Sequence, residues 1–64
     1  MEPNEIESIR LRLGYSQAAA AAKAGVSTAA WNHWELGNRR PHKLRLPVLR
    51  RMQRRAEQLA ARAQ

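Results

Sequence analysis

The stretch Ser16–Gly37, SQAAAAAKAGVSTAAWNHWELG, constrains the fold of this chain more than any other part of it. It contains two runs of helix-forming residues, separated by a tight turn around Gly25. Ser16 precedes the first run and Ser27 precedes the second, and a serine hydroxyl there can cap a helix by accepting a hydrogen bond from a free backbone N–H. A left-handed glycine commonly ends a helix, and three glycines each follow a helical run: Gly14, Gly25 and Gly37.

Two short helices joined by a turn that contains glycine form a helix-turn-helix unit, whose second helix can lie in the major groove of DNA. A simple αα-hairpin without a ligand is the alternative, and the spacing alone does not decide between them. The first helix, Gln17–Ala24, is almost all alanine, so it has high helix propensity but little apolar volume. The second, Thr28–Leu36, contains Trp31 and Trp34, which we expect to fill the space that the alanines leave.

The composition limits the classes of function that this chain can have. Its 64 residues are enough for one domain, residues 1–64, with a core so small that self-association would add stability. It has no cysteine, which excludes disulfides and thiolate metal sites. Its two histidines and five acidic residues show neither metal-ligand spacing nor a nucleophile beside a base. We therefore expect no enzyme activity, no metal or cofactor, and no small-molecule substrate.

The sequence also predicts no contact with a membrane. No apolar run approaches the roughly 18 residues that a transmembrane helix needs. The N-terminus, MEPNEIESIR, is acidic and polar, unlike a signal peptide. We therefore expect a cytoplasmic protein.

The positive charge is concentrated in the second part of the chain. Residues 1–38 have three basic and four acidic side chains, a net charge of −1, whereas residues 39–64 have nine basic side chains and one acidic, a net charge of +8. A one-sided basic region on a small domain is typical of proteins that bind a polyanion, most often nucleic acid. The alternative is a solvated face that only adds solubility.

An amphipathic helix is expected before the central stretch, over residues 5–13, with Asn4 as its N-cap and Glu7 completing a capping box. Its apolar residues recur at the spacing of one buried helix face. Together with the central stretch it predicts a core of Ile6, Ile9, Leu13, Val26, Trp31 and Trp34.

A structural ion pair is expected between the first helix and the third. Arg10 lies on the buried face of the first helix, where an unpaired charge would be costly. Glu35 lies four residues after Trp31, on or beside the buried face of its own helix. Arg10 and Glu35 are therefore predicted to pair.

A basic loop is expected over residues 38–46, NRRPHKLRL, because Pro41 argues against a helix through residue 40; a short helical turn over residues 42–45 also fits. Pro47 suits the first turn of a long last helix, over about residues 46–63. Its apolar residues begin at Leu49 and follow steps of three and four. The first of them can close the core, and the later ones can pair with a second subunit or form a frayed, solvated end. The candidates for a dimer contact are Met52, Ala56, Leu59 and Ala63.

The run IR…LGYSQ…A…AGVS…W..WE.G.RRP, from Ile9 to Pro41, resembles the phage-repressor or Cro-type helix-turn-helix family, also called the xenobiotic-response-element type. The elements SQ, GVS and WE.G.R.P are specific as an ordered set. The resemblance implies an all-α, lambda-repressor-like fold of four or five helices with a long C-terminal helix. It also implies the pairing of Arg10 with Glu35 that the helical faces predict. The chain differs from the family near Ala20, where a large aliphatic residue is usual.

Members of the family bind double-stranded DNA, usually as homodimers on an inverted repeat, and repress transcription. Carried over by position, the resemblance implies five base-reading residues on the third helix: Ser27, Thr28, Ala29, Asn32 and His33. It also implies five phosphate contacts: Gln17, Arg39, Arg40, His42 and Lys43. The amide of Asn32 suits a bidentate contact with adenine. Both tryptophans are assigned to the core rather than to stacking on bases.

The leading interpretation is a transcriptional repressor that occludes its promoter. It looks like the small autoregulators of phages and mobile elements, such as those that control anti-CRISPR operons. The alternative is an antitoxin-type module whose last helix docks a partner protein. A basic helix lying on an anionic membrane is disfavoured, because the apolar face of residues 47–62 has few large side chains.

Overall fold

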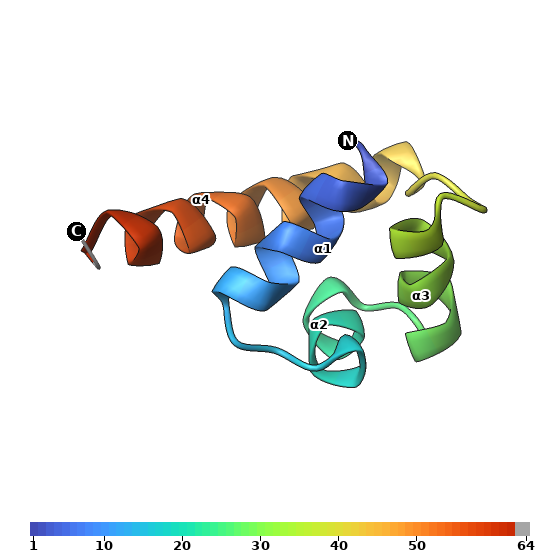
Figure 1. The fold of residues 1–64 in the computed structure, drawn as a ribbon. Coiled ribbons are helices and arrows are strands. Elements are labelled where there is room, and N and C mark those ends of the chain that lie inside the picture. The colour runs from blue at the N-terminus through green and yellow to red at the C-terminus, as the bar shows by residue number, and fades with distance from the viewer. Residues whose placement is uncertain (63–64) are drawn as a thin grey trace.

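The computed structural model describes residues 1–62, which form four α-helices and one short 3₁₀ turn (Figure 1). The helices are α1 (Pro3–Arg12), α2 (Gln17–Ala24), α3 (Thr28–Leu36) and α4 (Leu46–Arg62), and the turn is η1 (Lys43–Arg45). This part of the chain contains no strand. The predicted all-α fold with a long last helix is confirmed, and the described residues contain four α-helices rather than five.

The start of α1 differs from the prediction. The helix begins at Pro3 with Glu2 as its N-cap, two residues before the predicted start, and the backbone N–H of Glu2 donates to the carboxylate of Glu5 at 3.3 Å. Asn4 and Glu7 were therefore the wrong cap residues. The physical reason is that proline has no N–H to leave unsatisfied and its fixed φ suits the first helical position.

The caps of α2 and α3 are those that the sequence predicts. The hydroxyl of Ser16 accepts a hydrogen bond from the N–H of Ala19 at 3.1 Å, and that of Ser27 accepts one from Ala30 at 3.1 Å. Gly25 ends α2 in the left-handed region, with φ of 76°. This tight reversal sets α3 against α2, and the two helices pack against each other.

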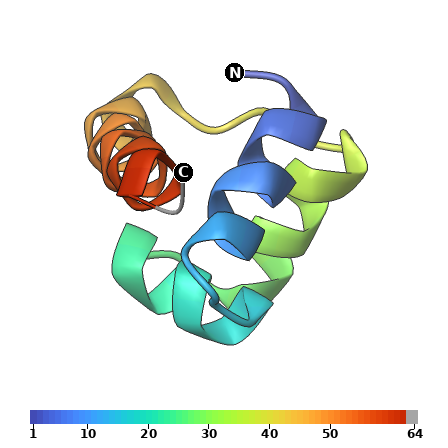
Figure 2. The same cartoon turned by 60° about the vertical axis from the view of Figure 1, so that its left-hand side comes forward.

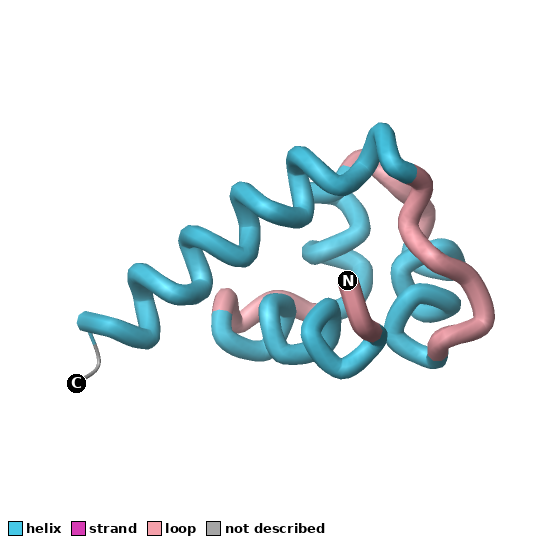
Figure 3. Tube along the Cα trace, turned by 90° about the horizontal axis from the view of Figure 1, so that it is seen from above, coloured by secondary structure: helices cyan, strands magenta, loops and turns pink. Residues whose placement is uncertain are grey.

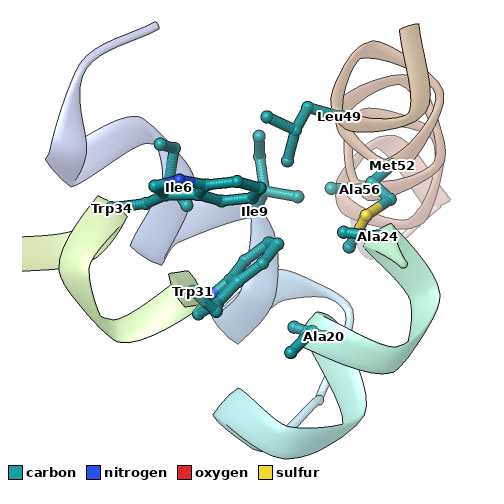
Figure 4. Close-up of a cluster of buried hydrophobic side chains, with 10 residues drawn as sticks. Ile6, Ile9, Ala20, Ala24, Trp31, Trp34, Leu49, Met52 and Ala56 are labelled. Atoms are coloured by element: carbon teal, nitrogen blue, oxygen red, sulfur yellow. The ribbon is translucent and has the colours of Figure 1, made fainter. Parts of the chain in front are cut away.

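The core lies where all four α-helices meet (Figure 4). Trp31 is fully buried, and its ring centroid is 5.5 Å from that of Trp34, with the two planes tilted by 50°. Three alanines of α2 are buried in the same core, so the large side chains of α3 occupy space that the small ones of α2 leave. The predicted core residues Ile6, Ile9, Trp31 and Trp34 are buried, whereas Leu13 and Val26 are half-buried and pack at its edge.

The last helix closes this core from the other side. Leu49, Met52 and Ala56 are buried against the other helices of the same chain. Met52 and Ala56 were therefore wrongly assigned to a dimer contact, because their side chains are already covered. Leu59 is half-buried, and Ala63 lies outside the described residues.

The arrangement places α1 between α3 and α4 (Figure 2), and α1 packs against both. Seen from above, the C-terminal half of α4 projects beyond the other helices (Figure 3). In residues 1–62, no helix is both long and apolar enough to cross a membrane.

Candidate nucleic-acid interface

The outward face of α3 holds the side chains that the sequence predicts as base readers. Ser27, Thr28 and Ala29 are exposed at the start of the helix, and Asn32 and His33 are half-buried on its next turn. Ser27 is the N-cap of α3, so its hydroxyl is engaged with Ala30. His33 Nδ1 lies 3.4 Å from Asn38 Nδ2, so this ring nitrogen is also engaged. Thr28 and Ala29 are the fully exposed side chains of this face without such a bond.

Glu35 holds α3 to α1 through the predicted ion pair. Arg10 Nε donates to Glu35 Oε2 at 2.6 Å and Arg10 Nη2 donates to Glu35 Oε1 at 3.1 Å, a bidentate arrangement. Arg10 Nη1 also donates to the carbonyl oxygen of Tyr15 at 3.2 Å. This hydrogen bond connects α1 to the loop before α2. The Glu35 side chain is 4% exposed and that of Arg10 is 16% exposed, so the pair is largely shielded from water.

This network changes the acidity of both groups. The hydrogen bond to Glu35 raises the pKa of Arg10 above its usual value. Burial alone would disfavour the charged form of Glu35, but hydrogen bonds from Arg10, Trp31 and Gln17 outweigh it and lower the pKa of Glu35. Both groups are therefore charged at neutral pH, and neither is left as an unpaired buried charge.

Gln17 extends the network to the recognition face. Its Nε2 donates to Glu35 Oε1 at 3.2 Å and to Asn32 Oδ1 at 3.2 Å. The sequence predicts a phosphate contact for Gln17, but it does not indicate this bond to Asn32, since the bond depends on the packing of α2 on α3. An amide oxygen has two lone pairs, so Asn32 keeps one acceptor site and its whole NH₂ group for a ligand.

The predicted phosphate contacts of the basic loop follow α3 directly. Arg39, Arg40, His42 and Lys43 are all exposed. His42 is also the N-cap of η1, and its Nδ1 accepts a hydrogen bond from the backbone N–H of Leu44 at 3.1 Å. This leaves only the other ring nitrogen of His42 for a ligand.

Two further features of the surface do not follow from the sequence pattern. Leu36, on the last turn of α3, is 63% exposed although it is large and apolar. The guanidinium of Arg45 lies close to Gly25, at the C-terminal end of α2. The dipole of a helix stabilises a positive charge at this end. Among residues 1–62 no group of three histidine or acidic side chains could hold a metal ion.

The chain was compared with known families, curated proteins and solved structures. A family model described as helix-turn-helix matches residues 6–52. This range includes most of α1, all of α2 and α3, the basic loop and the start of α4. No curated protein and no solved structure matches the chain.

Proposed function

The chain belongs to the Cro/C1-type helix-turn-helix family of DNA-binding transcription regulators, and we propose that it is a sequence-specific repressor of its own operon. In this proposal the whole chain is one DNA-binding domain that acts in the cytoplasm as a homodimer on an inverted repeat. The operon belongs to a phage or mobile element, such as one that encodes an anti-CRISPR protein. The W..WE.G signature supports this assignment.

The observation that carries the proposal is the fixed position of Asn32. Gln17 donates a hydrogen bond to the amide oxygen of Asn32 and a second one to Glu35. Glu35 in turn accepts from Arg10 of α1, which fixes α3 against α1. A base-reading amide that is fixed before binding loses less side-chain entropy when it meets DNA. Thr28 and Ala29 lie on the same face and offer methyl groups for contact with thymine.

The basic loop supports the same orientation on DNA. Arg39, Arg40 and Lys43 follow the recognition helix and are exposed, so they can reach the phosphates beside the groove that α3 enters. Phosphate contacts set the register of the protein and do not themselves read the sequence. They supply much of the affinity.

The proposed mechanism is steric. Two recognition helices of a dimer would enter successive major grooves, about 34 Å apart along the duplex. A dimer placed over a promoter would exclude RNA polymerase. The projecting end of α4, which carries the half-buried Leu59 and Ala60, is the part of the helix left for a two-fold contact (Figure 3).

Selection of bound duplexes from a random pool tests the proposal. We expect a palindromic consensus, whose half-site spacing gives the geometry of the dimer. A consensus without symmetry would contradict the homodimer, and recovery of unrelated sequences would contradict sequence-specific binding. Size measurement of the free protein and of its complex gives the number of chains independently.

A further inference from the structure

The outward face of α4 has a row of arginines that the recognition face does not use. Arg50, Arg51 and Arg54 surround a shallow, open hollow beside Pro47, and we call these three residues the arginine ridge. All three are exposed, and none forms an ion pair with any group in residues 1–62. They are on the side of α4 away from the core. The ridge is therefore a concentrated positive charge without an ion pair. The acidic side chain nearest to it along α4 is the exposed Glu57, three residues after Arg54.

The ridge and the recognition helix lie on different sides of the molecule. Figure 2 shows α3 and α4 on opposite sides of α1, which packs against both. A straight duplex seated on α3 therefore does not extend along the outward face of α4. Whatever neutralises the ridge is a different group of anions from the phosphates beside the recognition helix.

The chemistry of the ridge suits a phosphate backbone. Arg50 and Arg54 are one helical turn apart, about 6 Å along the axis. Double-stranded DNA has one negative charge per roughly 1.7 Å of its axis, so several phosphates fall within the reach of these side chains. A guanidinium can also bind a phosphate with two parallel hydrogen bonds.

The same face lacks what a protein or membrane partner would need. Beyond the arginines it carries Gln58 and Ala61, both exposed, and no large apolar side chain. Protein interfaces are centred on aromatic and large apolar anchors. Helices that lie on membranes bury an apolar face. Two ridges facing each other across a two-fold axis would repel, so this face does not suit a symmetric dimer either.

We propose that the arginine ridge is a second, sequence-independent site for the phosphate backbone of double-stranded DNA, which holds a segment other than the one on α3. This inference rests on the proposed function, because a repressor on its operator keeps DNA close to the ridge. The second segment comes from a distant part of the same molecule or from a separate duplex. In both cases the ligand is the sugar-phosphate backbone.

A bridging experiment tests the ridge. The duplex selected from the random pool is immobilised, protein is added, and capture of a labelled scrambled duplex is measured over a range of salt concentrations. The variant Arg50→Gln/Arg54→Gln removes two charges and keeps good helix formers. We expect it to bind the selected duplex within about threefold of the original protein, to capture about tenfold less scrambled duplex, and to lose about 2 from the salt slope of capture.

The matched control is Arg12→Gln/Lys23→Gln, which removes the same charge from exposed positions of α1 and α2. It should capture the scrambled duplex as the original protein does. Equal loss in both variants would overturn the proposal, because net charge alone would then explain capture. Undiminished capture by the ridge variant would also overturn it, since the second recognition helix of a dimer would then hold the scrambled duplex.

Loop formation on one long duplex separates the two sources of DNA. Loops that need the ridge identify a distant part of the same molecule, whereas ridge-dependent capture without loops identifies a separate duplex, and both support the proposal. Neither capture nor loops with the original protein would refute it. If the random pool yields no consensus but ridge-dependent capture persists between arbitrary duplexes, the repressor proposal fails and the ridge proposal stands.

Discussion

Asn32 is held in place before any DNA is present. Its amide oxygen accepts from Gln17, which in turn donates to Glu35. We expect Asn32→Ala to lose about 1–3 kcal/mol of preference for the operator over scrambled DNA, because a bidentate contact with one base is removed. Nonspecific binding should persist, since the phosphate contacts remain. Competition gel shifts with both duplexes measure this, and an equal loss on both would contradict a base-reading role.

Gln17 allows a second test of the same site. If it only orients Asn32, Gln17→Ala should weaken preference at the same base pair as Asn32→Ala, and the double variant should lose little more than Asn32→Ala alone. Both N–H groups of the Gln17 amide donate within the chain, so a bond to phosphate would require one of these hydrogen bonds to break. In that case the single variant should weaken binding to scrambled DNA as well. Binding measured on duplexes substituted at each position separates these two results.

Arg10 has the largest expected effect on stability. Arg10→Ala leaves Glu35 as a buried carboxylate without its cation, and breaking such a pair typically costs about 3–5 kcal/mol. Arg12→Ala, at an exposed position two residues away, should change the free energy of unfolding by less than about 0.5 kcal/mol. Urea denaturation of both variants makes the comparison. An unaltered midpoint for Arg10→Ala would rule out a stabilising pair.

The lowered pKa of Glu35 predicts a pH dependence with a definite sign. A carboxyl whose pKa is lower in the folded state stabilises the fold above its unfolded pKa, about 4.3, and loses that contribution as the pH falls through the folded value. The stability difference between the original protein and Glu35→Gln should therefore be constant from pH 7 to about pH 5. It should shrink toward pH 3. A difference that stays the same at pH 3 would contradict the assignment.

At the level of single elements, the turn between α2 and α3 depends on Gly25. Its φ of 76° is strained for any residue with a Cβ, and an added Cβ would lie 3.5 Å from Arg45 Nη1, an ordinary contact. Gly25→Ala should therefore cost about 1–2 kcal/mol from backbone strain alone. Gly14→Ala is the control, because its φ is 74° and nothing lies within 4 Å of the added Cβ. Thermal unfolding should give similar losses, and a much larger loss at Gly25 would indicate a clash.

The elements differ in how far the sequence predicts them. The caps of α2 and α3 are local, since a serine bonds to an N–H three residues later, so both were predicted. The start of α1 was misplaced because Asn4 is the better cap residue in isolation, whereas Pro3 favours the first helical position. The apolar stripe of α4 predicted a buried face, but a stripe does not show whether its own chain or a second chain covers it. Met52 was misassigned for that reason.

The interactions of the candidate site also differ in how far the sequence predicts them. The ion pair between Arg10 and Glu35 follows from two helical faces, and the family pattern places the same two residues together. The hydrogen bond from Gln17 to Asn32 could not be predicted, because it depends on how two helices pack and on the rotamers of two long side chains. The sequence places nine basic side chains in residues 39–64, but it does not show that Arg50, Arg51 and Arg54 share one exposed face of α4.

At the level of the whole molecule, the positive charge predicts how binding responds to salt. Arg39 and Arg40 lie in the loop after α3, and each phosphate contact contributes about 0.9 to the slope of log affinity against log salt. Arg40→Ala should weaken binding to operator and scrambled DNA alike and reduce the slope by about 1. Fluorescence anisotropy over a salt series measures it. A change in the preferred sequence with an unaltered slope would instead identify Arg40 as a base reader.

The α3 side chains that pack or form hydrogen bonds within the chain limit how the DNA sequence read by α3 can change during evolution. Trp31 and Trp34 are buried in the core and Trp31 donates a hydrogen bond to Glu35, whereas Thr28 and Ala29 are exposed. Substitutions at exposed positions usually change stability by less than about 0.5 kcal/mol, so these two positions can accept new side chains and one scaffold can acquire new operators. Asn32 is less free, because a replacement removes one of the two hydrogen bonds that Gln17 donates and leaves only the one to Glu35. Positions 17 and 32 should therefore vary as a pair among descendants of this chain that have switched to another operator.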